Sequence, residues 1–403
     1  MKKELEKYAE IVIKKGINLY KGQCLNIETS KDDYDFSLIL AETAYKNGAK
    51  YVNINVLSND LTKYRVLYSS EYLDYLPYFL TNRYLEQLAD DWANIRIDNT
   101  SEQDVLKEVP TDLLDKVTKT ERFARRRLLE EYGKHKHSWC VICSPNENWA
   151  KKSVNGNVDN LWNILKPILR LDKEEPLKAW DEHGKILINR AETLNKLNLK
   201  KLEFRSKNCE LNIYLTETSI WCGGPHAIPD GRYFIANIPT EEIFTVPDYR
   251  MTEGKVKCSR PVKIMERVIN GVWFEFKNGE VVNFGSDNDT ETLEKFINTD
   301  SNSKYLGEVA LVDKNSPIYK SSVIFNTILY DENAASHIAL GNGYPSCLSN
   351  GSILKNKEDL LNAGCNVSLV HTDFMIGSED MTVFGIDRSN KKHTIIDNGI
   401  FVI

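Results

Sequence analysis

The chain of 403 residues has no long apolar run, no excess of positive charge and little cysteine. No apolar stretch approaches the ~18 residues that a membrane-spanning helix needs. The 52 lysines and arginines are outnumbered by 58 acids, which leaves a net charge of −6 and disfavours a protein that binds nucleic acid through phosphates. The first residues mix charged with apolar side chains, unlike a secretory signal. We therefore expect neither a membrane nor a nucleic-acid partner.

The eight cysteines are scattered and lack the spacing of a disulfide framework. Free thiols are typical of a reducing compartment, so we expect a cytoplasmic protein. The segment HKHSWCVIC at 135–143 resembles a zinc-binding spacing. However, Cys140 and Cys143 lie three residues apart in a strand pattern and should point to opposite faces, whereas zinc needs convergent ligands. We interpret the segment as a buried strand.

Several common catalytic motifs are absent. The chain contains no GxxxxGK[ST], GxGxxG, GxSxG or HExxH sequence. Phosphate-loop enzymes, dinucleotide enzymes, nucleophile-elbow hydrolases and single-zinc proteases of that type therefore have no motif in their favour. What remains is a sparse set of acids and histidines in the C-terminal half.

The length and the apolar pattern predict two domains. At ~150 residues per domain the chain has room for two or three. Its first half alternates helical patterns with strand patterns at 24–29, 49–57, 93–98 and 138–145. This order is typical of an α/β domain with a mostly parallel, open sheet, which we expect over residues 1–198.

From residue 199 the pattern changes to short strands that follow one another across polar or glycine turns. Two short helices are expected among the last strands, at 332–340 and 357–364. We therefore expect a C-terminal α+β domain over residues 199–403.

The clearest chemical signal is His371 with Asp373 in the apolar strand pattern SLVHTDFMI. Residues two apart on a strand share a face, where an imidazole and a carboxylate can bind one metal ion. The alternative is a histidine oriented by an acid in a polar interior. Glu332 and His337 form a second pair, for which the alternative is an acid at a helix start and a packed histidine.

Three glutamates complete the set. Glu308 lies in the strand pattern LGEVALV, a costly position unless a cation neutralises the carboxylate or an edge exposes it. Glu241 and Glu242 are neighbours, so only one of them should point into a site. Several carboxylates and two histidines are the inventory of a two-metal hydrolytic centre, and such donors suit zinc, cobalt, manganese or magnesium alike.

These segments resemble a known family, the metallo-aminopeptidases typified by aminopeptidase T, AmpS and PepS. The matching strings are NIPTEEIFTVPD, GEVALV, NTILYDENAASHIALGNGYP and VHTDFMIGS, in that order. KGQCLNI, NGAKYVNI and WCVICSPNENWA resemble the family's N-terminal domain. The resemblance implies a homodimer, with a large internal cavity, that removes the N-terminal residue from peptides with a free N-terminus.

Residue by residue, the resemblance implies catalytic roles for Glu332, as general base or outer ligand, and for Tyr344, as a donor to the oxyanion. Glu308 is the candidate bridging ligand, and whether Glu241 contributes stays open. His226 and all cysteines stay outside the set. Two divalent metal ions per subunit would activate water for attack on the first peptide bond. Their implied ligands are Glu242, Glu308, His337, His371 and Asp373.

Two alternatives stay open at this point. One is a metal-binding peptide carrier that keeps the centre but does not turn over substrate. The other keeps the two metals for a different hydrolysis, such as carboxypeptidase or amidase chemistry.

Overall fold

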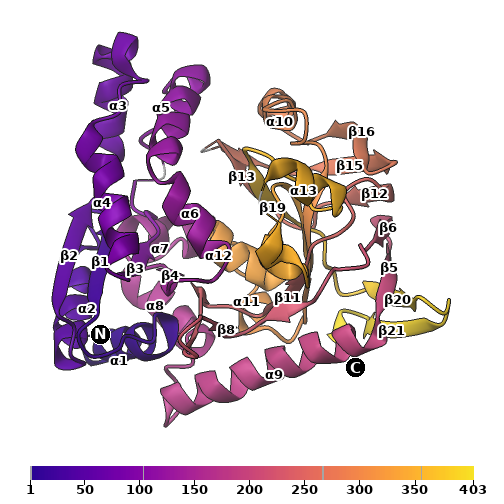
Figure 1. Ribbon diagram of the computed structural model, residues 1–403, viewed down its shortest axis with the longest axis horizontal. Helices are drawn as coiled ribbons and strands as arrows, with labels where there is room; N and C mark the ends of the chain where they lie inside the picture. Colours follow the sequence, from indigo (N-terminus) through magenta and orange to yellow (C-terminus); the bar gives the residue numbers. More distant parts are fainter. Residues whose placement is uncertain (1, 103, 266, 355) are drawn as a thin grey trace. The chain divides into compact units, whose positions relative to one another are not determined.

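The computed structural model describes residues 2–102, 104–265, 267–354 and 356–403 (Figure 1). The chain forms two compact units, the first made of Met1–Asp181 with Pro225–Pro239 and the second of Glu182–Gly224 with Thr240–Ile403. Each unit has its own sheets. The domain boundary between residues 198 and 199 stays a prediction.

The first unit is built on a five-stranded sheet with the order β10-β4-β3-β1-β2, in which every neighbouring pair is parallel. The expected parallel, open sheet is therefore confirmed. The strands are β1 Cys24–Thr29, β2 Tyr51–Val56, β3 Ala93–Ile97, β4 Trp139–Ile142 and β10 Asn237–Ile238. A short hairpin precedes β10, formed by β8 His226–Ala227 and β9 Tyr233–Phe234.

Strand β10 corrects the sequence interpretation, which placed residues 231–238 among the strands of the second domain. In the structure this segment pairs with β4 of the first unit. The sequence could not reveal this because the pairing partner of a two-residue strand leaves no trace in its apolar pattern.

Apolar helix faces pack within the first unit. Tyr8 stacks on Phe36 with ring centroids 5.3 Å apart, which joins the first two helices. Helices α3 and α5 lie side by side (Figure 1). Helices α5 and α6 are separated at Arg125. The helices are α1 Lys2–Ile11, continued by a π-helical turn Val12–Gly16, α2 Tyr34–Lys46, α3 Asn59–Tyr68, α4 Tyr78–Ala89, α5 Thr111–Ala124, α6 Arg126–Tyr132, α7 Glu147–Val154, α8 Val158–Ile168 and α9 Pro176–Leu197, which continues into the second unit.

The second unit contains two large antiparallel sheets. The larger has the order β16-β15-β12-β6-β5-β20-β21-β22 and the other the order β19-β18-β17-β11-β7. The strands of the larger sheet are β5 Leu199–Ser206, β6 Cys209–Tyr214, β12 Glu253–Lys257, β15 Trp273–Lys277, β16 Glu280–Gly285, β20 Thr382–Asp387, β21 Lys392–Asp397 and β22 Ile400–Phe401. Those of the smaller are β7 Cys222–Gly223, β11 Glu242–Thr245, β17 Leu306–Val312, β18 His337–Gly341 and β19 His371–Met375.

A separate hairpin and short helices accompany these sheets in the described part of the second unit, so the expected α+β class is confirmed. The hairpin pairs β13 Val262–Ile264 with β14 Arg267–Ile269. The helices are α10 Thr290–Ile297, α11 Pro317–Lys320, α12 Ile328–Asp331 and α13 Lys357–Asn362. No helix among the described residues is both long and apolar enough to cross a membrane.

The helix expected over 332–340 is wrong. The chain instead forms a 3-10 turn over Glu332–Ala334 and then the strand β18, which pairs with β17 on one side and β19 on the other. The segment is rich in Ala and Leu, which favour a helix in isolation. Two neighbouring strands that offer backbone partners along both edges outweigh that preference.

Candidate metal centre

The strand register places all five expected metal ligands on one face of the smaller sheet. Glu308 of β17, Ala339 of β18 and Asp373 of β19 lie directly opposite one another. Residues opposite each other in an antiparallel pair share a face, as do residues two apart along a strand. His337 pairs with Ala310 and His371 with Gly341, and both are therefore on this face, as is Glu242, which pairs with Val312.

The opposite face of β19 belongs to the apolar core. Phe374 points there and meets Phe274 edge-to-face, with ring centroids 4.8 Å apart. Core packing therefore fixes the rotation of β19, and this rotation turns His371 and Asp373 toward the other donors. Strand β19 thus has one face in the apolar core and one face toward the expected metal ligands.

The first group of donors consists of Glu242, Glu308 and His337. The Nε2 atom of His337 lies 3.1 Å from Glu242 Oε2 and 4.0 Å from Glu308 Oε1. One ligand atom from each residue lies within 4.8 Å of the others. All three are buried, and His337 is only 1% exposed.

The second group consists of Glu308, His371 and Asp373. The Nε2 atom of His371 lies 3.4 Å from Glu308 Oε2 and 3.4 Å from Asp373 Oδ1. The two groups share Glu308, which faces one imidazole with each of its carboxylate oxygens. This carboxylate thus lies between two sets of donor atoms.

Backbone carbonyls orient both histidines. His337 Nδ1 lies 3.1 Å from the Ala335 oxygen, and His371 Nδ1 lies 2.7 Å from the Asn342 oxygen. A carbonyl can only accept, so each Nδ1 carries the proton and donates. When either ring loses its second proton, its Nε2 lone pair faces the carboxylates, which is the tautomer that a metal ligand needs.

Burial of several acids together shifts their protonation. Burial, reinforced by Asp373 and Glu242, raises the pKa of Glu308 to about 8. Burial alone would lower the pKa of His371, but Asp373 and Glu308 outweigh it and raise that pKa to about 9. The pKa of His337 is likewise raised, by Glu242 above all, against the effect of burial. Without another source of positive charge, protons on Glu308, His337 and His371 therefore reduce the repulsion among the buried acids.

The donor set fits divalent cations. Among the described residues Glu242 Oε2 is buried without a hydrogen bond of acceptable geometry, although His337 Nε2 lies 3.1 Å away. A buried carboxylate oxygen in that state is costly unless a cation compensates it. Carboxylate oxygens and imidazole nitrogens are donors that zinc, cobalt and manganese accept, and the carboxylates also suit magnesium.

Glu332 is buried beside the two groups and is held by its neighbour. It follows α12 in the 3-10 turn, and its Oε1 accepts a hydrogen bond from Asn333 Nδ2 at 3.3 Å. It also hydrogen-bonds Asp373. Burial, with added repulsion from Asp373 and Glu242, raises the pKa of Glu332 well above its ordinary value.

Sequence reasoning missed Asn333. Its side chain is fully buried and accepts from the Glu241 backbone N–H at 2.7 Å, while its Nδ2 donates to the Leu329 carbonyl at 2.9 Å. Asn333 therefore joins Glu332 to the chain immediately before Glu242. The only signal in the sequence was its position next to Glu332, which no spacing rule singles out.

Tyr344 lies at the edge of the centre, three residues after β18. Its hydroxyl is 3.4 Å from His371 Nε2, and its ring packs edge-to-face on Phe244 with centroids 6.0 Å apart. Burial and the nearby Glu308 and Asp373 raise the pKa of Tyr344 well above its ordinary value. The phenol is therefore protonated at neutral pH and able to donate a hydrogen bond.

Glu241 points away from the centre, in agreement with the expectation for neighbouring residues. Its Oε2 lies 3.7 Å from Nε2 of His183, which also contacts the Thr240 carbonyl at 2.8 Å. His226 belongs to the first unit, where its ring lies 4.1 Å from that of His135. Cys140 and Cys143 are buried in and after β4, and neither belongs to a group of metal-donor atoms found among the described residues.

Buried carboxylates and oriented imidazoles in this arrangement are the donor groups typical of metal-dependent hydrolases. The model of the family described as "Thermophilic metalloprotease (M29)" matches residues 1–401, and the chain belongs to this family. It is therefore a hydrolase of the metalloprotease class, and the resemblance drawn from its motifs is confirmed.

Curated relatives match over nearly their whole length. Aminopeptidase 2 of Geobacillus stearothermophilus is 35% identical over 403 residues, which cover 98% of this chain and 97% of the relative. Aminopeptidase T of Thermus aquaticus is 31% identical over 405 residues, covering 99% and 98%. The solved structure titled "Wild-type AmpT from Thermus thermophilus" superposes with a TM-score of 0.92 at 31% identity and covers 100% of both chains.

Proposed function

We propose that the protein is an aminopeptidase that uses two divalent metal ions to hydrolyse the first bond of peptides with a free N-terminus. The position of Glu308 between two donor groups carries the proposal, because a carboxylate that offers one oxygen to each group suits a ligand shared by two ions. The names of the relatives, all aminopeptidases, support the substrate class.

We assign one ion to each donor group. Glu242 and His337 would hold the first ion, His371 and Asp373 the second, and Glu308 would bridge them. All five lie in the C-terminal region, 199–403, which we propose as the catalytic domain. Zinc, cobalt, manganese and magnesium all remain compatible with these donors.

When bound, the ions supply Lewis acidity and lower the pKa of water toward neutrality. Glu332 would take the proton of the attacking water and pass it to the leaving amine, a role that requires its ionised form, which cations bound beside it would favour. Tyr344 donates its hydroxyl hydrogen to the carbonyl oxygen as negative charge develops there. Asn333 keeps the Glu332 carboxylate in place through its Nδ2 donor.

The acids of the centre also suit an enzyme that recognises a free amino group. One of the carboxylates Glu242, Glu308, Glu332 and Asp373, or one of the ions they would hold, can bind the free amino group of an unblocked peptide, which an acetylated peptide lacks. Comparison of free and N-acetylated peptides therefore separates aminopeptidase from amidase chemistry. Peptides blocked at the C-terminus separate it from carboxypeptidase chemistry.

The decisive variant is Glu332→Gln. It keeps the shape of the side chain and an oxygen that accepts from Asn333, but it cannot take a proton. We expect kcat to fall by about 10²–10⁴-fold while the metal content, measured by mass spectrometry of the purified protein, stays unchanged. A metal-loaded wild-type protein that leaves a broad panel of unblocked peptides intact would contradict the proposal and favour a peptide carrier.

Two further properties belong to the proposal. Cytoplasmic location is supported by the eight cysteines, which are few and lack the spacing of a disulfide framework. A homodimer is supported by exposed aromatic side chains on and around α3 and α4, because exposed apolar surfaces often mark protein contacts. These side chains are Tyr64, Tyr68, Tyr72, Tyr78 and Phe79. Sedimentation of the purified protein tests the dimer.

A further inference from the structure

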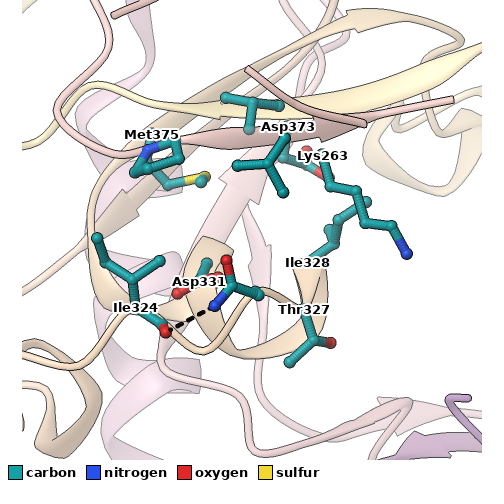
Figure 2. A pocket seen from close by; sticks show the side chains of 11 residues that line it. Lys263, Ile324, Thr327, Ile328, Asp331, Asp373 and Met375 are labelled. Atoms are coloured by element: carbon teal, nitrogen blue, oxygen red, sulfur yellow. Dashed lines mark hydrogen bonds between the residues drawn. The ribbon is translucent and has the colours of Figure 1, made fainter. Parts of the chain in front are cut away.

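Glu242 and Asp373 lie on opposite sides of the candidate metal centre and are supported differently by the sheet. Asp373 lies in the middle of β19, next to a small pocket that Met375 also lines (Figure 2). Glu242 is the first residue of β11, and the pairing of β11 with β7 begins only at Ile243. The two residues before Glu242 belong to no helix or strand. Side-chain contacts must therefore hold the backbone that leads into Glu242.

The peptide group between Thr240 and Glu241 has such contacts at both ends. Its carbonyl oxygen lies 2.8 Å from Nε2 of His183, and since a carbonyl can only accept, Nε2 donates. Its N–H donates to Oδ1 of Asn333 at 2.7 Å. Because a peptide group is planar, two hydrogen bonds at opposite ends fix the orientation of the whole plane. Only the φ and ψ angles of Glu241 separate this plane from the peptide group of Glu242.

The two hydrogen bonds come from separate elements of the second unit. His183 lies on α9, and Asn333 lies in the 3-10 turn after α12. Thr240 is 8% exposed and Glu241 7% exposed, so water does not readily replace either partner. A buried backbone group that loses its partner is costly, which favours this one arrangement of the chain before Glu242.

Helix α9 also contacts the strand that pairs with Glu242. Arg190 follows His183 by seven residues, about two helical turns, and therefore lies on the same face of α9. Its Nη2 lies 3.2 Å from Oδ2 of Asp313. Asp313 directly follows Val312, the residue of β17 that pairs with Glu242. One face of α9 thus contacts both strands where Glu242 pairs.

We propose that His183 is a positioning residue of the metal centre, which orients Glu242 toward its ion through the Thr240 carbonyl. The inference rests on the proposed function, in which Glu242 and His337 hold the first ion. Hydrogen bonds that orient metal ligands are typically worth about 10–100-fold in affinity. Loss of the His183 donor therefore weakens the first ion by such a factor and changes the second ion much less.

A pair of variants tests the hydrogen bond itself. His183→Leu removes the donor, whereas the amide of His183→Gln reaches the position of Nε2 and can still donate to Thr240. The zinc-loaded proteins are titrated with a chromogenic chelator, which gives the affinity of each ion. In His183→Leu one ion should bind at least about tenfold more weakly than in the wild type, and in His183→Gln both affinities should stay close to those of the wild type.

A double variant tests whether the effect passes through Glu242. Glu242→Gln weakens the ligand that His183 positions, so its removal from service and the loss of His183 should not add. In the Glu242→Gln background, His183→Leu should change the affinity of either ion by less than about threefold. A general loss of packing would add fully in this background.

The matched control is His393→Leu. Nε2 of His393 also makes a 2.8 Å hydrogen bond, to Oδ2 of Asp387, and its side chain is 18% exposed against 12% for His183. This variant should keep the wild-type affinity for both ions. If His183→Leu does not fold, His183→Asn replaces it in the comparison with His183→Gln, because the shorter amide does not reach the Thr240 carbonyl.

The outcomes separate the positioning role from the proposed function. The positioning role alone is overturned if the wild-type protein holds two zinc ions and His183→Leu binds both equally well. Equal losses in His183→Leu and His183→Gln, or in His183→Leu and His393→Leu, overturn it too. A wild-type protein that cannot hold two zinc ions overturns the two-metal centre of the proposed function, and the positioning role with it.

Discussion

Replacement of Asn333 by alanine tests whether one buried amide holds Glu332 and the Glu242 strand together. The change removes the acceptor for the Glu241 N–H and the donor to the Leu329 carbonyl, at 2.7 and 2.9 Å. Since Asn333 is 0% exposed, water does not readily replace these partners. At about 1–3 kcal/mol for each buried group left unsatisfied, the free energy of unfolding should fall by about 3 kcal/mol.

The same change should affect catalysis separately. Glu332 loses the Nδ2 donor at 3.3 Å, so its carboxylate is less well placed, and we expect kcat to fall by about 10–100-fold with a smaller change in KM. Asn333→Asp keeps an acceptor for Glu241 N–H but sets a carboxylate against Glu332, and it should lose at least as much activity.

Urea denaturation and steady-state kinetics on a free dipeptide measure the two effects of the Asn333 variants. The matched control is Asn298→Ala, because this exposed asparagine makes one similar hydrogen bond, to the Glu294 carbonyl at 3.0 Å. The control should cost less than about 1 kcal/mol and leave kcat unchanged. If Asn333→Ala costs no more than the control and keeps full activity, the assigned role of Asn333 is wrong.

Three further predictions concern acid stability, the phenol and metal binding. Burial lowers the pKa of His135 to about 4 and also lowers that of His226, so the unfolded chain binds more protons below pH 6.5. The free energy of unfolding should therefore lose nothing from these histidines above pH 6.5 and should fall by about 3 kcal/mol as the pH drops from 6.5 through 4. His135→Asn should make the free energy of unfolding, measured by denaturation at several pH values, depend less on pH in this range. Tyr344→Phe should lower kcat by about 10²-fold with metal content unchanged; equal rates would exclude the phenol as a donor. Because Glu308 and His371 have pKa values of about 8 and 9 without metal, zinc should displace protons and bind more weakly as the pH falls below 8. Calorimetric titrations in buffers of different ionisation enthalpy measure the released protons.

The sequence predicted the parts of the centre that depend on strand periodicity. The two-residue spacing of His371 and Asp373 placed both on one face, and the adjacency of Glu241 and Glu242 implied that only one would point inward. These inferences held because the alternation of side chains along a strand is a local property of the backbone. The assignment of these residues as ligands stays a proposal.

Other features depend on partners distant in the sequence. His337 was expected in a helix, but β17 and β19 on either side hold its segment as a strand. Asn333 carries no recognisable motif, and its role follows from bonds to residues as far away as Glu241. Such contacts arise from tertiary packing, which local propensity does not encode.

The parallel sheet of the first unit has a consequence for synthesis on the ribosome. Its edge strand β10 emerges from the ribosome only after residues 182–224 of the second unit. Until then β4 presents an open edge in the nascent chain, the kind of surface that invites pairing with other polypeptides. The first unit therefore cannot finish folding before synthesis of the second unit has begun.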